Sequence, residues 1–239
     1  MKSQCFKFKL PIFIIIALIV VNAAIKNFNI KNFNIKNNNA IQRNNKAGVT
    51  PNKSEYIKKN GLKDAEIKKS QEVKHKQENL ENKWKIGYDE FFEKKYVQAI
   101  ETERQVLKED PNFYKAYAVE GIALAYSGNF KNGIEQIDRA LKLNPDYGYA
   151  RFNKALANEL YEHYDEAIKW YKSALEVEKF EWSYYGIASI YGRKGDIENT
   201  IKYLKLAIDI NPNVKNSAKN EEDFDNVQDS MEFKELIKK

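Results

Sequence analysis

The chain has 239 residues, of which 40 are Lys or Arg and 34 are Asp or Glu, so its formal net charge is +6. A single cysteine, Cys5, excludes an intramolecular disulfide as a source of stability. Residues 1–60 hold eleven of the basic residues and one acid. The rest of the chain is therefore mildly acidic, which argues against a nucleic-acid-binding body.

Residues 1–25 have the pattern of an export signal. Three lysines precede an apolar run, Leu10–Val21, which ends in Asn22-Ala23-Ala24. Val21 and Ala23 suit the −3 and −1 positions of a cleavage site. The run is shorter than the roughly 20 residues that span a bilayer, so we expect cleavage, with an uncleaved membrane anchor as the alternative. The expected location is extracytoplasmic, periplasmic or secreted, or anchored in a membrane by this segment.

Two further segments separate this signal from the body of the protein. Asn, Lys and Ile dominate residues 26–60, with almost no acid. Such a composition buries too little apolar surface to offset the entropy of ordering, which predicts a disordered tether. Its basic charge suits contact with an anionic membrane surface. Residues 61–79 have few helix breakers and a thin apolar stripe, which predicts a partly exposed leader helix.

A unit of about 34 residues then recurs four times over residues 80–212. Each copy has a small residue, an aromatic residue or Ile nine positions later, a short side chain after three more and an apolar residue after a further seven. The copies align at Gly87, Gly121, Ala155 and Ala188; at Tyr96, Phe130, Tyr164 and Ile197; at Ala99, Gly133, Ala167 and Thr200; and at Val106, Ala140, Ala174 and Ala207. Such periodicity predicts stacked supersecondary units that bury their apolar faces only against one another.

Each unit is predicted to be two helices joined by a tight turn. The small residue lies mid-way along the first helix, where the second helix must approach closely. Gly128 and Gly195 suit the left-handed end of a first helix, and Asn129 and Asp196 suit the cap of the next. Proline follows the second helix in three copies, at Pro111, Pro145 and Pro212. Three of the aromatic residues that open the second helices are expected in the core, namely Tyr96, Phe130 and Tyr164.

These residues resemble the tetratricopeptide repeat, which has small, aromatic, small and proline positions in this order. The resemblance covers about 80–212 and implies an all-α, right-handed superhelix with units at 80–113, 114–147, 148–180 and 181–213. The third copy departs from the pattern, since it lacks the proline and is one residue short. Residues 214–239 carry Phe224, Val227 and Phe233 on an otherwise charged segment, and look like the terminal capping helices of such arrays.

The sequence offers no constellation for catalysis. Its two histidines are expected to be solvated: His75 has only Glu78 and Asn79 at i+3 and i+4 on a charged helix, and His163 lies in a predicted turn. No Cys-His pair and no glycine-rich phosphate loop occurs. The carboxylates are scattered over predicted helix surfaces. We therefore expect no enzymatic activity, no metal site and no cofactor.

The resemblance implies a concave inner face lined by the first helices, at unit positions two, five, nine, twelve and thirteen. Aromatic side chains dominate these positions and suit a peptide or helix, because they offer large apolar area and a polar handle. Packing inside the array is the alternative role for the same side chains. The predicted partner-binding residues are Trp84, Tyr88, Phe91, Tyr126, Tyr149, Phe152, Trp182 and Tyr185.

The function predicted from the sequence is that of an exported scaffold or adaptor that binds another protein or peptide. Chaperone adaptors of the family hold a C-terminal carboxylate with a Lys/Asn/Arg clamp. Here Trp84, Tyr88 and Val119 occupy clamp positions, so that activity is not implied. The alternative is a structural subunit whose array self-associates, as an oligomer, within a cell-envelope assembly.

Overall fold

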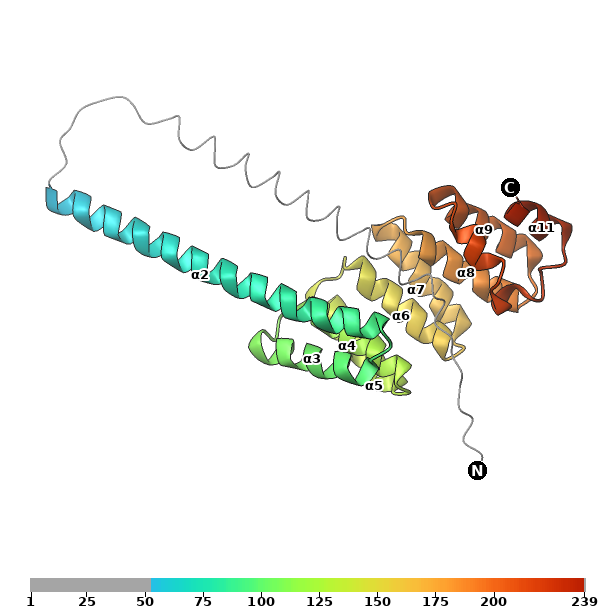
Figure 1. Cartoon of the computed structure of the whole chain (residues 1–239), viewed down its shortest axis with the longest axis horizontal. Coiled ribbons are helices and arrows are strands. Elements are labelled where there is room, and N and C mark those ends of the chain that lie inside the picture. Colours follow the sequence, from blue (N-terminus) through green and yellow to red (C-terminus); the bar gives the residue numbers. More distant parts are fainter. Residues whose placement is uncertain (1–52, 239) are drawn as a thin grey trace, which may run out of the picture. The chain divides into compact units, whose positions relative to one another are not determined.

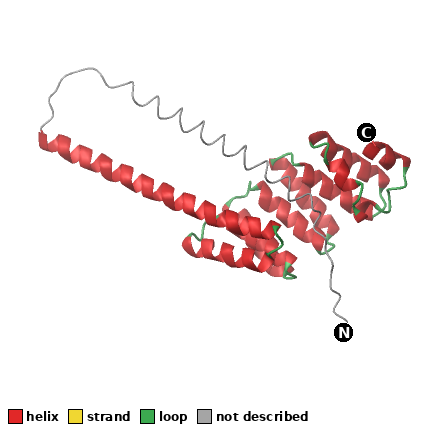
Figure 2. Ribbon diagram, in the orientation of Figure 1, coloured by secondary structure: helices red, strands yellow, loops and turns green. Residues whose placement is uncertain are grey.

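The computed structural model describes residues 53–238, and side chains from residue 68 onward. Every regular element in this range is helical, which confirms the predicted all-α class (Figures 1 and 2). The predicted signal or anchor and most of the tether, residues 1–52, lie outside the described residues. Among the helices of residues 53–238, none combines the length and apolarity that crossing a bilayer requires.

The chain divides into two compact units, residues 1–79 and 80–239. Helix α2 (Lys53–Phe92) supplies the described part of the first unit. It begins at Lys53 and not at residue 61, so residues 53–60 are helical, contrary to their assignment to the tether. This segment is rich in Lys and contains Glu55, and both residue types favour helix. Residues 68–79 of α2 are exposed.

The second unit consists of four helix pairs followed by a short terminal segment (Figure 1). Helices α4, α6 and α8 begin at residues 114, 148 and 181, the first residues of the predicted repeats. They contact one another in sequence, α4 with α6 and α6 with α8, while each also contacts its own second helix. The pairs are α2 from Leu80 with α3 (Tyr96–Glu109), α4 (Tyr114–Tyr126) with α5 (Phe130–Leu143), α6 (Gly148–Leu160) with α7 (Tyr164–Val177), and α8 (Glu181–Arg193) with α9 (Ile197–Ile210).

Small side chains allow the two helices of a pair to cross closely, as the spacing predicts. A Cβ atom at Gly121 would lie 2.7 Å from the carbonyl oxygen of Gly133, and one at Gly133 would lie 2.6 Å from that of Gly121. In the third and fourth pairs Ala155 and Ala188 take the place of Gly121 and are fully buried. The repeat therefore fixes where the two helices of each pair touch.

All four turns between paired helices use a left-handed residue. Gly128 and Gly195 take φ values of 91° and 72°, as predicted. Lys94 and Glu162 occupy the same place in the first and third units at φ 62°, which strains an L-residue. The residue after each glycine caps the following helix, since its side chain accepts a hydrogen bond from the amide three residues on, at 3.4 Å in the second unit and 3.0 Å in the fourth.

The aromatic residues that open the second helices are half-buried, so their assignment to the core was wrong. They lie next to an exposed turn, where one side of each ring stays near solvent. Tyr96 packs against Tyr126 at 5.4 Å between ring centroids, and Phe130 against Tyr161 at 4.7 Å. The core along the second helices comes instead from smaller residues that are 0–4% exposed, namely Val106, Ala140, Ala174 and Ala207.

The last segment covers the end of the array. It comprises α10 (Val214–Ala218), the 3₁₀ helix η1 (Glu222–Phe224) and α11 (Met231–Lys238). Helix η1 contacts α8, and α11 contacts α9. Phe224, Val227 and Phe233 are each 1% exposed. Gly192 makes room for this cap, because a Cβ there would lie 2.7 Å from the ring of Phe224.

Candidate partner-binding site

We define the inner face as the side of the first helices, α2 from Leu80, α4, α6 and α8, that carries unit positions two, five, nine, twelve and thirteen. The structure buries most of the aromatic residues predicted to bind a partner there. Those that are half-buried are Trp84, Tyr126 and Tyr149. Those that are 2–7% exposed are Tyr88, Phe91, Phe152, Trp182 and Tyr185.

The N-terminal part of the inner face is an aromatic cluster, formed by Trp84, Tyr88, Phe91, Phe92, Tyr126 and Tyr149. The ring of Tyr88 lies 5.3 Å from Trp84, 4.7 Å from Phe92 and 5.8 Å from Tyr149. The contact with Tyr149 joins the first helix of the first repeat to that of the third. Rings therefore fill the inner side across three repeats, where ring contacts add roughly 0.5–1.5 kcal/mol each to the apolar area they bury.

The C-terminal part of the inner face contains a charged network of Glu159, Arg193 and Asp223. Arg193 Nε and Nη2 donate to the two carboxylate oxygens of Asp223 at 2.6 and 2.8 Å. Arg193 Nη2 also lies 3.3 Å from Glu159 Oε1. Tyr171 and Ser189 donate to the same Glu159 carboxylate at 2.6 and 2.9 Å. The network thus links α6, α7 and α8 to the cap.

In this network, burial and the neighbouring cation shift carboxylate pKa values in opposite directions. Burial raises the pKa of Glu159, while the Arg193 guanidinium and the hydroxyl groups of Tyr171 and Ser189 lower it. Glu221, on the adjoining cap, has its pKa raised to about 7, first by burial and then by the neighbouring carboxylate of Asp223. A single guanidinium, that of Arg193, therefore lies among three carboxylates, those of Glu159, Glu221 and Asp223.

Neither Glu159 nor Ser189 was predicted from the sequence as a site residue. These two occupy positions twelve and nine of their repeats, so a polar residue at an inner position was the available signal. Asp223 gave no such signal, because the terminal segment has no repeat register.

Four polar atoms on inner-face aromatic residues are buried without a hydrogen-bond partner among the described residues. They are Nε1 of Trp84 and Trp182 and the hydroxyl oxygens of Tyr149 and Tyr185. Buried polar groups are nearly always paired, and an unpaired one costs about 1–3 kcal/mol. All four atoms lie on the inner face, so this surface has hydrogen-bonding groups that the described residues leave unpaired.

Glu103 on α3 is a separate buried acid. It is fully buried, and neither carboxylate oxygen has a hydrogen-bond partner in the part of the chain described. Burial, followed by the carboxylates of Glu120 and Glu90, raises its pKa to about 10. The side chain abuts Gly87, where any Cβ would collide with it. Its enclosure between α2 and α3 gives a substrate no access, so its role is structural.

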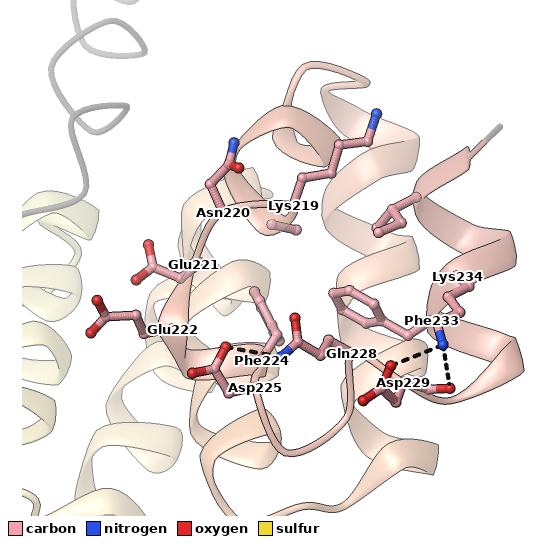
Figure 3. Close-up of a pocket in the computed structure, with 12 residues that line it drawn as sticks. Lys219, Asn220, Glu221, Glu222, Phe224, Asp225, Gln228, Asp229, Phe233 and Lys234 are labelled. Atoms are coloured by element: carbon pink, nitrogen blue, oxygen red, sulfur yellow. Dashed lines mark hydrogen bonds and ion pairs between the residues drawn. The ribbon is translucent and has the colours of Figure 1, made fainter.

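The cap carries a partly open pocket of about 360 Å³ (Figure 3). Its apolar wall includes Phe224 and Phe233. Lys234 closes one side through hydrogen bonds of 2.9 and 3.0 Å to Asp229. Figure 3 shows the carboxylate of Glu221 pointing away from Lys234, Asp229 and the two phenylalanine rings. Within residues 68–238, no group of three or more His, Cys, Asp or Glu side chains is arranged to hold a metal ion.

Family models of the tetratricopeptide repeat match residues 119–180 and 183–214. An uncharacterised protein of Methanocaldococcus jannaschii is 38% identical over 72 residues, which are 29% of this chain and 84% of that protein. A DnaJ homolog subfamily C member 7 homolog of Dictyostelium discoideum is 25% identical over 167 residues, 60% of this chain. The match spans only 31% of that longer protein. The solved structure of TTC0263, a thermophilic TPR protein of Thermus thermophilus, superposes with a TM-score of 0.53 at 17% identity, over 59% of this chain and 78% of that one, and shows the likeness of fold alone.

Proposed function

Because the chain belongs to the tetratricopeptide repeat family, we propose that it is a non-enzymatic scaffold whose inner face holds a peptide or helix of another protein. The observation that carries this proposal is the set of four unpaired polar groups on inner-face aromatic residues. A peptide backbone offers the carbonyl and amide groups that would satisfy them after small ring rotations. No other surface of the described residues combines aromatic area with so many unpaired polar groups.

The burial of the aromatic residues divides their roles. The five that are 2–7% exposed form the floor of the inner face, and their packing holds the first helices together. A peptide lying on this floor reaches the polar ends of Trp182 and Tyr185 only after small ring rotations. Trp84, Tyr126 and Tyr149 are half-buried and keep an accessible edge. These three are the anchors available to a partner, since contact energy concentrates in aromatic residues that lose their remaining exposure on binding.

Site-specific crosslinking tests this role. A photoreactive phenylalanine analogue is placed at Tyr149 and, as a matched control, at Val97, which is 62% exposed on the second helix α3. Irradiation in the cell of origin should give discrete protein adducts from position 149 and none from position 97. Adducts of equal yield at both positions, or none at 149, would contradict the proposed inner-face function.

We also propose that residues 1–25 direct the scaffold out of the cytoplasm. The apolar run Leu10–Val21 behind three lysines supports this location. The measurement is the N-terminus of the protein purified from its own cell, together with its fraction. A start at Ala24 in a soluble extracytoplasmic fraction indicates a free adaptor, whereas an intact Met1 in membranes indicates an anchored one.

A self-associating envelope subunit is the second candidate. It is favoured by large apolar residues that are 38–62% exposed on second helices, namely Val97, Leu143, Ile197, Leu206 and Ile210. Light scattering separates the two functions. A mass that grows with protein concentration supports self-assembly, and a constant monomer mass supports the adaptor.

A further inference from the structure

We propose that the inner face beside the cap contains a cation subsite, which receives a Lys or Arg side chain of the bound peptide. The subsite is formed by Tyr185 of α8 together with Glu221 and Asp223 of the cap. It rests on the proposed function, because it specifies the chemistry of one position in the peptide.

The charges around the subsite are out of balance. Arg193 is the guanidinium shared by Glu159 and Asp223, at 3.3 Å and 2.6 Å respectively. Glu221 has no ion pair of its own among those the structure shows. When this carboxylate is ionised, it adds a negative charge for which the neighbouring residues supply no further cation, and a bound cation would favour its ionised form. A negatively charged group at the end of the inner face selects a positively charged side chain.

The nearby lysines are oriented or engaged elsewhere. Lys194, the residue after α8, forms an ion pair of 3.2 Å with Asp165 of α7. Lys219 is close in sequence, but Figure 3 shows its amine pointing away from the carboxylate of Glu221. A partner can therefore supply the cation that pairs with Glu221.

A second observation, independent of the carboxylates, points to a ligand. The Tyr185 side chain is 5% exposed, yet its hydroxyl oxygen has no hydrogen-bond partner among the described residues. Burial and then the carboxylates of Glu221, Asp223 and Glu159 raise the pKa of this hydroxyl well above its ordinary value. An uncharged hydroxyl among carboxylates can accept a hydrogen bond from an ammonium or guanidinium group.

The aromatic surroundings also suit a cation. The ring of Tyr185 lies 5.3 Å from that of Trp182 and 5.6 Å from that of Phe224. Aromatic faces attract an ammonium or guanidinium group and accommodate the methylene stem of Lys or Arg. A divalent metal ion fits less well, because the carboxylates do not form a metal-binding group within residues 68–238.

The test uses the full chain and three acetylated, amidated heptapeptides in which leucine alternates with lysine, acetyl-lysine or glutamate. Acetyl-lysine keeps the lysine stem and removes its charge, so it isolates the cation. Binding is measured by fluorescence anisotropy with the wild type, Glu221→Gln and the matched control Glu198→Gln, which removes the same charge from the exposed surface of α9.

We expect the lysine peptide to bind at least tenfold more tightly than the other two. Glu221→Gln should weaken the lysine peptide three- to tenfold and leave the acetyl-lysine peptide unchanged, while Glu198→Gln should change neither. Circular dichroism establishes that both variants keep the fold. Equal binding of the lysine and acetyl-lysine peptides, or equal effects of the two variants, would overturn the subsite.

These outcomes separate the subsite from the proposed function. If the lysine and acetyl-lysine peptides bind equally and compete with the crosslink at position 149, the inner face binds peptides without selecting a cation. If no peptide binds and position 149 gives no adduct, the proposed function fails together with the subsite.

Discussion

The two ends of the inner face join successive repeats through different interactions. The N-terminal end uses contacts between aromatic rings, and the C-terminal end uses ion pairs and hydrogen bonds. In the first two repeats, positions twelve and thirteen supply Phe91 and Tyr126 to the aromatic cluster. In the third and fourth, the same two positions supply Glu159 and Arg193 to the charged network. The backbone repeat thus sets where side chains from successive repeats meet, but leaves open whether they meet through apolar area or through directed hydrogen bonds.

The aromatic cluster and the charged network differ in how well they tolerate the loss of one side chain. The burial of apolar ring area is non-directional, so the loss of one ring removes area and leaves the other rings packed. The charged network depends on every member, since the loss of one partner leaves a buried charge uncompensated. We therefore expect single substitutions to act more severely in the charged network than in the aromatic cluster.

The largest effect is expected for Arg193→Ala. This change leaves the buried Glu159 and the cap residue Asp223 without their shared guanidinium, and should lower the free energy of unfolding by roughly 3–5 kcal/mol. Chemical denaturation measures the loss, and hydrogen exchange should show faster exchange in residues 221–238. The control is Arg139→Ala, which removes an exposed pair with Glu135 at 2.7 Å and should cost at most about 0.5 kcal/mol.

Trp84→Ala tests the aromatic cluster in the same way. Trp84 packs against the core cluster of Leu80, Val106, Phe113 and Ala116, and against the ring of Tyr88. Because it is only half-buried, its removal should cost roughly 2–4 kcal/mol, less than the loss of Arg193. Denaturation of the two variants side by side gives the comparison. A larger loss for Trp84→Ala would reverse the ranking of the two regions.

The two regions were not equally predictable from sequence. The repeat period fixed the starts of α4, α6 and α8, and glycine with a capping residue fixed two of the four turns. Periodicity could not show that Tyr88 reaches Tyr149, because that contact depends on how tightly three repeats curve. The aromatic residues were therefore recognised, but the extent of their burial was not.

The charged network could not be predicted from the sequence, for a different reason. The polar residues Glu159 and Ser189 were visible at inner positions, but their meaning depends on a partner outside the repeat. Asp223 lies 30 residues beyond Arg193, in a segment with no periodicity. A pair of that kind becomes evident only when the cap is placed on α8.

Glu103→Gln tests a buried acid near the aromatic cluster that forms no ion pair among the described residues. Its pKa of about 10 lies above the ordinary value of 4.5, so folding takes up a proton at neutral pH. The contribution of Glu103 to stability is fully present below pH 4.5 and is lost as the pH rises through 10. Gln cannot ionise, so the variant should be more stable at pH 7 by roughly 2 kcal/mol.

Unfolding free energies at pH 5, 7 and 8.5 test this sign. The advantage of Glu103→Gln should grow with pH, with Glu90 and Glu120 as the other acids acting on the site. Glu101→Gln on the exposed side of α3 is the matched control and should show no such trend. A variant that loses stability equally at every pH would mean that Glu103 is held as a carboxylate.

The smallest effects are expected at the turns, where the two regions are alike. Lys94 in the first repeat and Glu162 in the third both hold φ at 62°. Glycine at either position removes the left-handed penalty but loosens the unfolded chain, for a net gain of about 0.5–1 kcal/mol. Lys95→Gly and His163→Gly, one residue further on, lack that penalty and serve as controls.

Comparing the two turn variants shows whether the regions unfold together. Neighbouring repeats are coupled through their interfaces, and a strongly coupled array unfolds as one unit. In that case Lys94→Gly and Glu162→Gly should shift the same denaturation transition by the same amount. If Glu162→Gly shifts only a second transition, the charged end with its cap is a separate unit. The charged network would then stabilise that end alone, and the aromatic contact between Tyr88 and Tyr149 would be too weak to couple the two.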